Sequence, residues 1–143
     1  MDKINVIFWT QTGNTQAMAK AIGEGIEEAG KEAAVTAVFN ASLEELKNAE
    51  AFALGCPAMG AEVLEEGEME PFVAEVEGFA AGKTIALFGS YGWGDGEWMR
   101  DWADRMSAAG AKVLNGEGLI CQDAPGEDAL ADCKALGKQL AAL

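Results

Sequence analysis

The chain of 143 residues contains no histidine and only three cysteines, Cys56, Cys121 and Cys133. The cysteines are widely spaced and form no C-x-x-C pair, so neither a metal site nor a disulfide framework is predicted. Without histidine, and with Cys56 in no visibly basic setting, the sequence offers no acid, base or activated nucleophile for making or breaking covalent bonds. Cys121 and Cys133 are predicted to be small buried side chains.

Basic residues are scarce, because 10 Lys and Arg stand against 24 Asp and Glu, giving a formal net charge of −14. Such a charge repels nucleic acid and anionic membranes, and it favours partners that present Lys and Arg. No apolar run approaches membrane-spanning length, and residues 1–3 lead directly into an apolar segment without room for a signal peptide. We therefore expect a cytoplasmic protein with no nucleic-acid or membrane partner.

Half of the residues are apolar, which at this length is typical of a single domain over residues 1–143. Five apolar segments predict strands, at residues 4–9, 33–39, 51–55, 83–89 and 112–120, the last interrupted near 116–118. Helical patterns follow them, at residues 18–29, 43–48, 69–79, 99–109 and 130–143. Ser42 is predicted to cap the second helix, with Glu45 completing a capping box. This alternation predicts an α/β fold, a doubly wound five-stranded parallel sheet in three layers.

A sheet of this kind binds ligands beyond the carboxyl ends of its strands. The first loop in that position, residues 10–15, reads Thr-Gln-Thr-Gly-Asn-Thr and joins a strand to a helix. Its hydroxyls and N–H groups, at the positive end of the helix dipole, can hold a phosphate monoester. Asn14 follows Gly13 where a Walker A loop has lysine, so triphosphate chemistry is not predicted. An ordinary turn followed by a helix cap is the alternative.

The loop at residues 89–98 contains four glycines and three aromatic residues. Aromatic side chains on such a loop have little core to enter, so Tyr91 or Trp93 is expected to lie against a planar ligand. Trp98 and Trp102 stand at helical spacing, and we expect both in the core.

The loop at residues 56–62 offers a polarisable methionine and a carboxylate. Met59 could cover the opposite face of a planar ring, and Glu62 could accept hydrogen bonds from the edge of that ring. The three loops together therefore predict a site for a planar, phosphorylated ligand.

Two other users of similar folds are excluded by their chemistry. A receiver domain needs an acidic cluster at its strand ends, where this chain has Thr10 and Cys56. A low-molecular-weight phosphatase needs Cys-x5-Arg, yet the residues six positions after Cys56 and Cys121 are Glu62 and Glu127.

Three segments give the chain a resemblance to flavodoxins of the short-chain clostridial type. They are residues 10–15, residues 55–62 (Gly-Cys-Pro-Ala-Met-Gly-Ala-Glu) and residues 87–99 (Leu-Phe-Gly-Ser-Tyr-Gly-Trp-Gly-Asp-Gly-Glu-Trp-Met). The resemblance spans essentially the whole chain and implies the family's strand order, 2-1-3-4-5, with FMN bound non-covalently where that order reverses. The implied FMN-binding residues are Thr10, Gln11, Thr12, Gly13, Asn14, Thr15, Pro57, Ala58, Met59, Gly60, Glu62, Ser90, Tyr91, Gly92, Trp93 and Gly94.

Within that site the resemblance implies particular roles. Met59 and Trp93 would cover the two faces of the isoalloxazine, with Glu62 on its pyrimidine edge. The Gly60 carbonyl would turn toward flavin N5 upon one-electron reduction. Ala61 stands where relatives commonly carry Asp or Ser, and Gln11 replaces a small residue. If the turn at residues 59–62 is of type II, Ala61 must take a positive φ.

The function implied is that of a low-potential one-electron carrier, not an enzyme, working through the neutral semiquinone and the anionic hydroquinone of FMN. Its partners would be redox proteins with basic docking faces, namely reductases and low-potential oxidoreductases, and the carrier itself would be a monomer. The alternatives are a flavin enzyme acting on a diffusible substrate and an FMN sensor without redox function. An enzyme needs a substrate pocket, and no second domain is predicted to form one.

Overall fold

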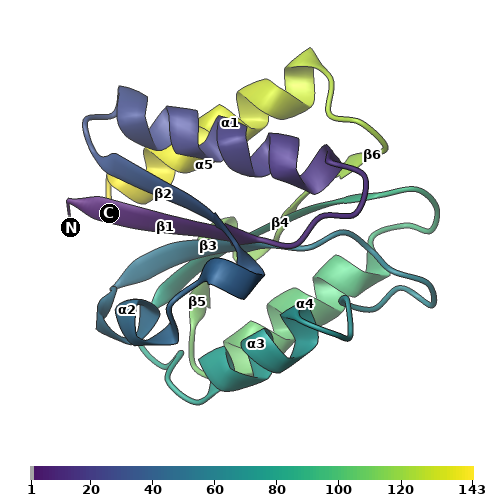
Figure 1. The fold of residues 1–143 in the computed structure, drawn as a ribbon, viewed down its shortest axis with the longest axis horizontal. Coiled ribbons are helices and arrows are strands. Elements are labelled where there is room, and N and C mark those ends of the chain that lie inside the picture. The colour runs from purple at the N-terminus through teal and green to yellow at the C-terminus, as the bar shows by residue number, and fades with distance from the viewer. Residues whose placement is uncertain (1) are drawn as a thin grey trace.

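The computed structural model describes residues 2–143 as one parallel sheet between two layers of helices (Figure 1). The strands are β1 (Lys3–Phe8), β2 (Glu32–Ala37), β3 (Ala51–Gly55), β4 (Thr84–Tyr91), β5 (Lys112–Val113) and β6 (Leu119–Gln122). The helices are α1 (Asn14–Glu28), α2 (Leu43–Asn48), α3 (Met69–Glu77), α4 (Glu97–Ala108) and α5 (Glu127–Ala141). All strand pairs are parallel, in the order β2-β1-β3-β4-β5 with β6 also beside β4, which confirms the predicted fold.

The fifth position of the sheet is filled by two short strands. Val113 of β5 pairs with Ile85 of β4, and Leu119 of β6 pairs with Phe88 of β4. Five residues therefore lie between the two pairs on the β5–β6 side, but only two lie between them on β4. A 3₁₀ turn, η2 (Leu114–Gly116), takes up the excess, with Asn115 at a φ of 68°. The interruption expected in this strand is confirmed, although the turn begins earlier than residue 116.

The second strand ends earlier than expected, at Ala37 rather than residue 39. Its register with β1 ends where Phe8 pairs with Ala37, so residues beyond have no strand to pair with. They form a 3₁₀ turn, η1 (Val38–Asn40), that leaves the Phe39 side chain 71% exposed. β2 is also an edge strand, and none of its side chains is fully buried.

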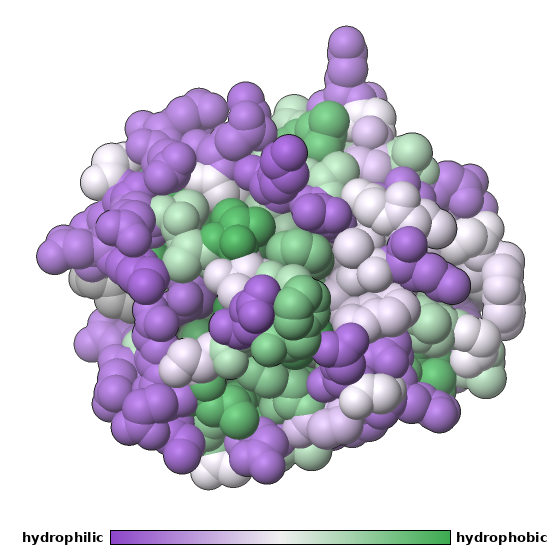
Figure 2. Space-filling model, viewed as in Figure 1, coloured by the Kyte–Doolittle hydropathy of each residue, from purple (hydrophilic) through white to green (hydrophobic). Residues whose placement is uncertain are grey.

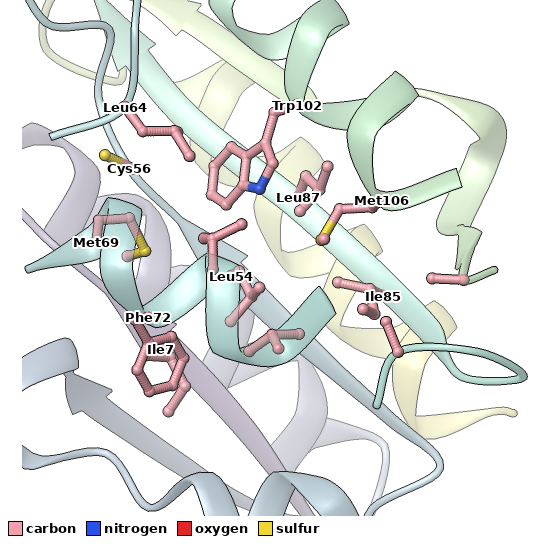
Figure 3. Close-up of a cluster of buried hydrophobic side chains, with 14 of the residues drawn as sticks. Ile7, Leu54, Cys56, Leu64, Met69, Phe72, Ile85, Leu87, Trp102 and Met106 are labelled. Carbon is pink, nitrogen blue, oxygen red and sulfur yellow. The ribbon is translucent and has the colours of Figure 1, made fainter. Parts of the chain in front are cut away.

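Apolar side chains fill both sides of the sheet. Helices α1 and α5 cover one face, and α2, α3 and α4 lie on the other (Figure 1). Under α3 and α4, Trp102 lies among Leu54, Leu87 and Met106 (Figure 3). Trp98 and Trp102 are both buried, which confirms their assignment to the core.

Helices α1 and α5 touch through their backbones. A side chain at Gly25 would overlap the carbonyl of Lys134, and one at Gly137 would overlap the carbonyl of Ile22. Only residues without a Cβ permit this approach, so the two glycines determine how closely the helices pack.

The capping box predicted for α2 is half correct. The Ser42 hydroxyl accepts a hydrogen bond from Glu45 N at 3.2 Å, as expected of an N-cap. The Glu45 carboxylate does not return to the helix, because it is paired with Lys3 Nζ at 2.7 Å and accepts from Asn5 Nδ2 at 3.5 Å. The ion pair with Lys3 on β1 therefore holds the Glu45 carboxylate away from the backbone N–H that a capping box would require.

Hydrophilic residues cover most of the face shown in Figure 2, with smaller apolar areas between them. No helix formed by residues 2–143 combines the length and the apolar character that crossing a membrane requires.

Candidate functional site

The three unusual loops meet at the carboxyl edge of the sheet, on the right in Figure 1. They enclose a pocket of about 270 Å³. Its lining residues are Thr10, Gln11, Thr12, Asn14, Thr15, Pro57, Ala58, Ser90, Tyr91, Gly92, Trp93 and Asp123. All of them except Asp123 belong to the predicted set, and the loops are therefore brought together as the sequence suggested.

The first loop leaves the N-terminus of α1 without a side-chain cap. Gly13 is the N-cap residue, at a φ of 95°, and no side chain bonds to the first turn of the helix. The Thr10 hydroxyl instead accepts a hydrogen bond from Gly13 N at 3.0 Å, which closes the loop on itself. The alternative of a turn followed by an N-cap holds only in part, because the turn and the Gly13 N-cap are present but no side chain caps the helix. The N–H groups of the first turn are therefore left without a side-chain partner at the positive end of the helix dipole, where an anion can be accommodated.

Thr15 fastens this loop to the sheet. Its side chain is 1% exposed, and its hydroxyl lies 3.2 Å from the Ser90 hydroxyl, at hydrogen-bond distance. Ser90 N also donates to Thr15 Oγ1 at 3.4 Å. Thr15 therefore positions the loop as well as lining the pocket.

The third loop is anchored by one tryptophan and exposes another. Trp98 is buried, donates from Nε1 to the Cys56 carbonyl at 3.1 Å and packs on Tyr91, with ring centroids 5.6 Å apart. Ala58 N donates to the Ser90 carbonyl at 3.0 Å, which joins the second loop to β4. Trp93 is 63% exposed at the pocket wall, although burial is the usual state of so large an apolar side chain.

The second loop contains a tight turn beside the pocket. Glu62 N donates to the Met59 carbonyl at 2.9 Å. Ala61 has a φ of 65° and Glu62 a φ of 51°, whereas Gly60 is outside the left-handed region. Positive φ at the third residue is the type II geometry considered above, and it strains alanine. The predicted site residues that lie outside the pocket lining are Gly13, Met59, Gly60, Glu62 and Gly94.

Glu62 has a buried oxygen with no hydrogen-bond partner among residues 2–143. This atom, Oε1, rests against Gly94, where any side chain would displace it. A buried, unpaired acceptor is costly, and a ligand N–H would satisfy it. Gly94 and Glu62, from the third and second loops, are therefore close to each other.

Cys56 begins the second loop, and Glu65 follows the loop with its backbone N 3.5 Å from the Cys56 sulfur. Although burial opposes the charge on Glu65, its carboxylate accepts from the N–H groups of Gly67, Glu68 and Met69 at 2.6 to 3.0 Å, and these bonds hold its pKa below the usual value. This cap on α3 was not anticipated. Burial raises the pKa of the Cys56 thiol to about 12, so the thiol stays neutral and is no nucleophile.

Asp123 is the lining residue that the sequence analysis missed. It follows β6 with a φ of 57°, and its N–H donates to the Tyr91 carbonyl at 2.8 Å. The rule that ligands bind beyond the carboxyl ends of the strands also applies to the interrupted fifth strand, and that signal could have identified it.

Other parts of the molecule are less suited to a polar ligand. A hollow of about 900 Å³ runs along α1, β2 and α5 and includes none of the loop residues. Within residues 2–143, no three Cys, Asp or Glu side chains are grouped to hold a metal ion.

The hydroxyls that line the pocket, the exposed Trp93 at its wall and the unpaired oxygen of Glu62 outside the lining are compatible with a planar, phosphorylated group such as FMN. The sequence profile described as Flavodoxin matches residues 6–137. The chain is 47% identical to a flavodoxin of Clostridium beijerinckii, over 96% of this chain and 99% of that protein. The two-electron reduced flavodoxin of Megasphaera elsdenii has a similar structure, with a TM-score of 0.86 and 36% identity over 98% of this chain and 99% of that one. The chain therefore belongs to the flavodoxin family, in its short-chain clostridial type, and is an FMN-binding electron-transfer protein and not an enzyme.

Proposed function

We propose that residues 1–143 form one FMN-binding domain that carries single electrons at low potential between redox proteins, through the neutral semiquinone and the anionic hydroquinone of FMN. The observation that carries this proposal is the pocket built by three loops, with Trp93 exposed at its wall. An exposed edge lets a partner approach the ring closely, and a carrier needs no further pocket.

At the phosphate end we assign the first loop. Thr10, Thr12, Gly13, Asn14 and Thr15 would surround the phosphate with hydroxyls and N–H groups, and Gln11 would lie beside them. The loop contains no Lys or Arg, so neutral donors and the helix dipole replace cations.

At the ring we assign the other two loops. Met59 and Trp93 would cover the two faces, and Glu62 would accept from the pyrimidine edge through its unpaired oxygen. Gly60 would supply the carbonyl that turns toward the ring. The remaining residues, which line the pocket or flank it, are Pro57, Ala58, Ser90, Tyr91, Gly92 and Gly94.

The acidic surroundings support a low second potential. A second electron places negative charge on the flavin. Two unit charges 10 Å apart repel by roughly 1.7 kcal/mol at an effective dielectric constant near 20, equivalent to roughly 70 mV for one electron before salt screening. The acids near the second and third loops include Glu62, Asp95 and Glu97.

Stepwise reduction of the FMN-loaded protein, followed by visible absorption, tests the proposal. We expect a long-wavelength absorbance that rises with the first electron and falls with the second. A direct conversion from the oxidised to the fully reduced spectrum would contradict one-electron transfer and favour a sensor without redox function.

Replacing Trp93 by alanine should weaken FMN binding by at least the roughly 0.5 to 1.5 kcal/mol typical of an aromatic pair, because one ring face loses its cover. The flavin visible spectrum should shift as well. Fluorescence titration measures the affinity, and Trp93→Phe, which keeps an aromatic face, is the matched control. If Trp93→Ala changed neither the affinity nor the spectrum, Trp93 would not lie against the ring.

Replacing Ala61 by glycine should lower the first one-electron potential by tens of millivolts. The left-handed φ of Ala61 strains the turn by about 1 to 2 kcal/mol, and about 1.4 kcal/mol corresponds to about 59 mV for one electron. Glycine adopts this φ without strain, so the variant loses the part of the free energy that favours rearrangement of the turn upon the first reduction. We expect a smaller effect on the second potential. An unchanged or raised first potential in a redox titration would show that this strain does not act on the couple.

The proposed partners present basic docking faces. Electron transfer to such a partner, below saturation, should slow as salt increases from about 0.02 to 0.5 M, because salt screens the attraction. Glu66→Gln, in the second loop region, should reduce the rate at low salt more than Asp132→Asn on α5. A rate of electron transfer that does not change with salt concentration would contradict electrostatic docking for that partner.

We also propose that the protein is a monomer and is located in the cytoplasm. Sedimentation tests the first proposal, and cell fractionation tests the second.

A further inference from the structure

A small cleft lies beside the pocket, where the carboxyl ends of β1 and β2 meet. Phe8 pairs with Ala37 at the last position of the register, so the chain leaves these two neighbouring strands at the same level (Figure 1). The cleft, of about 140 Å³, is formed by residues 8–10, residues 37–39 and Glu68, and we call it the Phe39 cleft. Thr10 lines both this cleft and the pocket assigned to FMN, so the two cavities are adjacent.

The Phe39 cleft has an apolar floor and aromatic walls. Phe8 and Val38 are buried, whereas Trp9 is half-buried and Phe39 is 71% exposed. The faces of aromatic rings carry negative partial charge, so a cation placed over one of them is attracted. The exposed ring of Phe39 is therefore accessible to a cation from outside the molecule.

Glu68 adds a full negative charge to this cleft. Its Oε1 accepts a hydrogen bond from Trp9 Nε1 at 3.2 Å, which holds the carboxylate beside the indole. A carboxylate has about four acceptor positions, so most of them stay free. Glu68 forms no ion pair within residues 2–143. Residues 4–19, 32–46 and 48–82, which include every segment of the cleft, contain neither Lys nor Arg. The cleft therefore offers an acceptor for a cation that its own segments do not supply.

The size of the cleft favours a single side chain as its occupant. Pockets for drug-sized ligands enclose about 300 to 1,000 Å³, well above the volume of this one. Arginine matches both the walls and the charge, because its planar guanidinium stacks on aromatic faces and its N–H groups bind a carboxylate in pairs. The lysine ammonium is a strongly hydrated point charge without a flat face, and it matches only the charge.

We propose that the Phe39 cleft is a docking site for one arginine side chain of the redox partner, with the guanidinium stacked on Phe39 and paired with Glu68. This inference rests on the proposed function, which gives the carrier a partner with a basic face. It specifies one residue type on that face and the place where that residue binds. An arginine held in the cleft brings the partner next to the pocket, since Thr10 belongs to both cavities. Arginine is also enriched among the residues that dominate the affinity of protein interfaces.

The test measures the binding of two small probes, Nα-acetyl-arginine amide and Nα-acetyl-lysine amide, to the FMN-loaded protein by NMR titration at low ionic strength. The indole N–H signal of Trp9, which lies at the Glu68 carboxylate, reports on the cleft, and Trp9→Phe assigns it. We expect this signal to titrate with a lower Kd for the arginine probe than for the lysine probe. Phe39→Ala should raise the Kd of the arginine probe about two- to fivefold, as expected for an exposed contact between a cation and a ring.

Matched variants separate the ring, the charge and the apolar surface. Phe39→Leu keeps a large apolar side chain without a ring, and it should weaken the arginine probe as Phe39→Ala does. Glu68→Gln should weaken both probes, and it should do so more than Glu66→Gln, which removes an exposed charge outside the cleft. Leu143→Ala, which removes exposed apolar surface at the C-terminus, should leave both affinities unchanged.

Two results would overturn the proposal: equal affinities for the two probes, or an arginine affinity that Phe39→Ala or Phe39→Leu leaves unchanged. The proposed function is tested separately by the absorbance during stepwise reduction. Phe39→Ala should leave that series unchanged, because Phe39 lies outside the pocket lining. A normal reduction series without a preference for arginine would reject the docking site alone, whereas a wild type without the intermediate absorbance would reject the carrier. Thermal unfolding confirms that each variant folds.

Discussion

Replacing Gly25 by alanine should lower the free energy of unfolding by about 2 kcal/mol, because the new Cβ would overlap the Lys134 carbonyl of α5. A backbone carbonyl cannot rotate away as a side chain can, so the helices must separate along their contact. The gain in helix propensity, about 1 kcal/mol, offsets only part of this cost. Gly137→Ala, which meets the Ile22 carbonyl, should have a similar effect. Urea unfolding of the FMN-free protein measures both.

Gly23 provides the matched control in the same helix. A Cβ there would lie 2.6 Å from the end of the Val35 side chain on the edge strand, which can shift at small cost. Gly23→Ala should therefore leave stability unchanged or raise it by up to about 1 kcal/mol. Equal effects at Gly23 and Gly25 would contradict the assignment of the helix contact to Gly25.

Replacing Thr12 by valine should weaken FMN binding by about ten- to a hundredfold and leave riboflavin unaffected. Hydrogen bonds to a charged acceptor contribute roughly 1.5 to 3 kcal/mol, and the phosphate is the part that riboflavin lacks. Thr12 is exposed at the pocket wall, so its replacement disturbs little packing. Thr15 is a poorer probe, because its hydroxyl also joins the loop to Ser90.

Thr12→Ser is the control, since it keeps the hydroxyl, and it should bind FMN nearly as the wild type does. Fluorescence titration with both ligands gives the ratio of affinities. A parallel loss of FMN and riboflavin in Thr12→Val would place Thr12 away from the phosphate.

Local composition was sufficient to predict the loops of the site. Glycine and aromatic residues in a loop, or hydroxyls before a helix, have few uses in a core, and the carboxyl ends of parallel strands place such loops together. The pocket residues Thr10, Thr12, Thr15, Tyr91 and Trp93 were therefore accessible from the loops themselves, whereas Gln11, Ser90 and Gly92 were named only through the resemblance. The burial of Trp98 was predicted from a different local signal, its helical spacing with Trp102.

The features that the sequence missed depend on contacts between distant segments. Asp123 reaches the pocket because β6 pairs with β4. The carboxyl-end rule points to the end of the fifth strand, but no pattern within that strand specifies the register of β6 beyond the break. Glu45 leaves its capping position because Lys3 lies on a neighbouring strand. Gly25 looks like a weak point of its helix until α5 is packed against it, since the spacing of apolar residues within α1 does not specify which of its residues touches a second backbone.

The turn between β5 and β6 can accommodate an inserted segment. Each short strand has its own register with β4, so a change in the length of η2 need not move either one. Gly116 and Glu117 are exposed in this turn, next to an Asn115–Gln139 amide pair that secures its start. Exposed turns of this kind tolerate inserted segments. A reporter peptide or an electrode-binding tag introduced between Gly116 and Glu117 would extend from the protein without entering the pairing of the sheet.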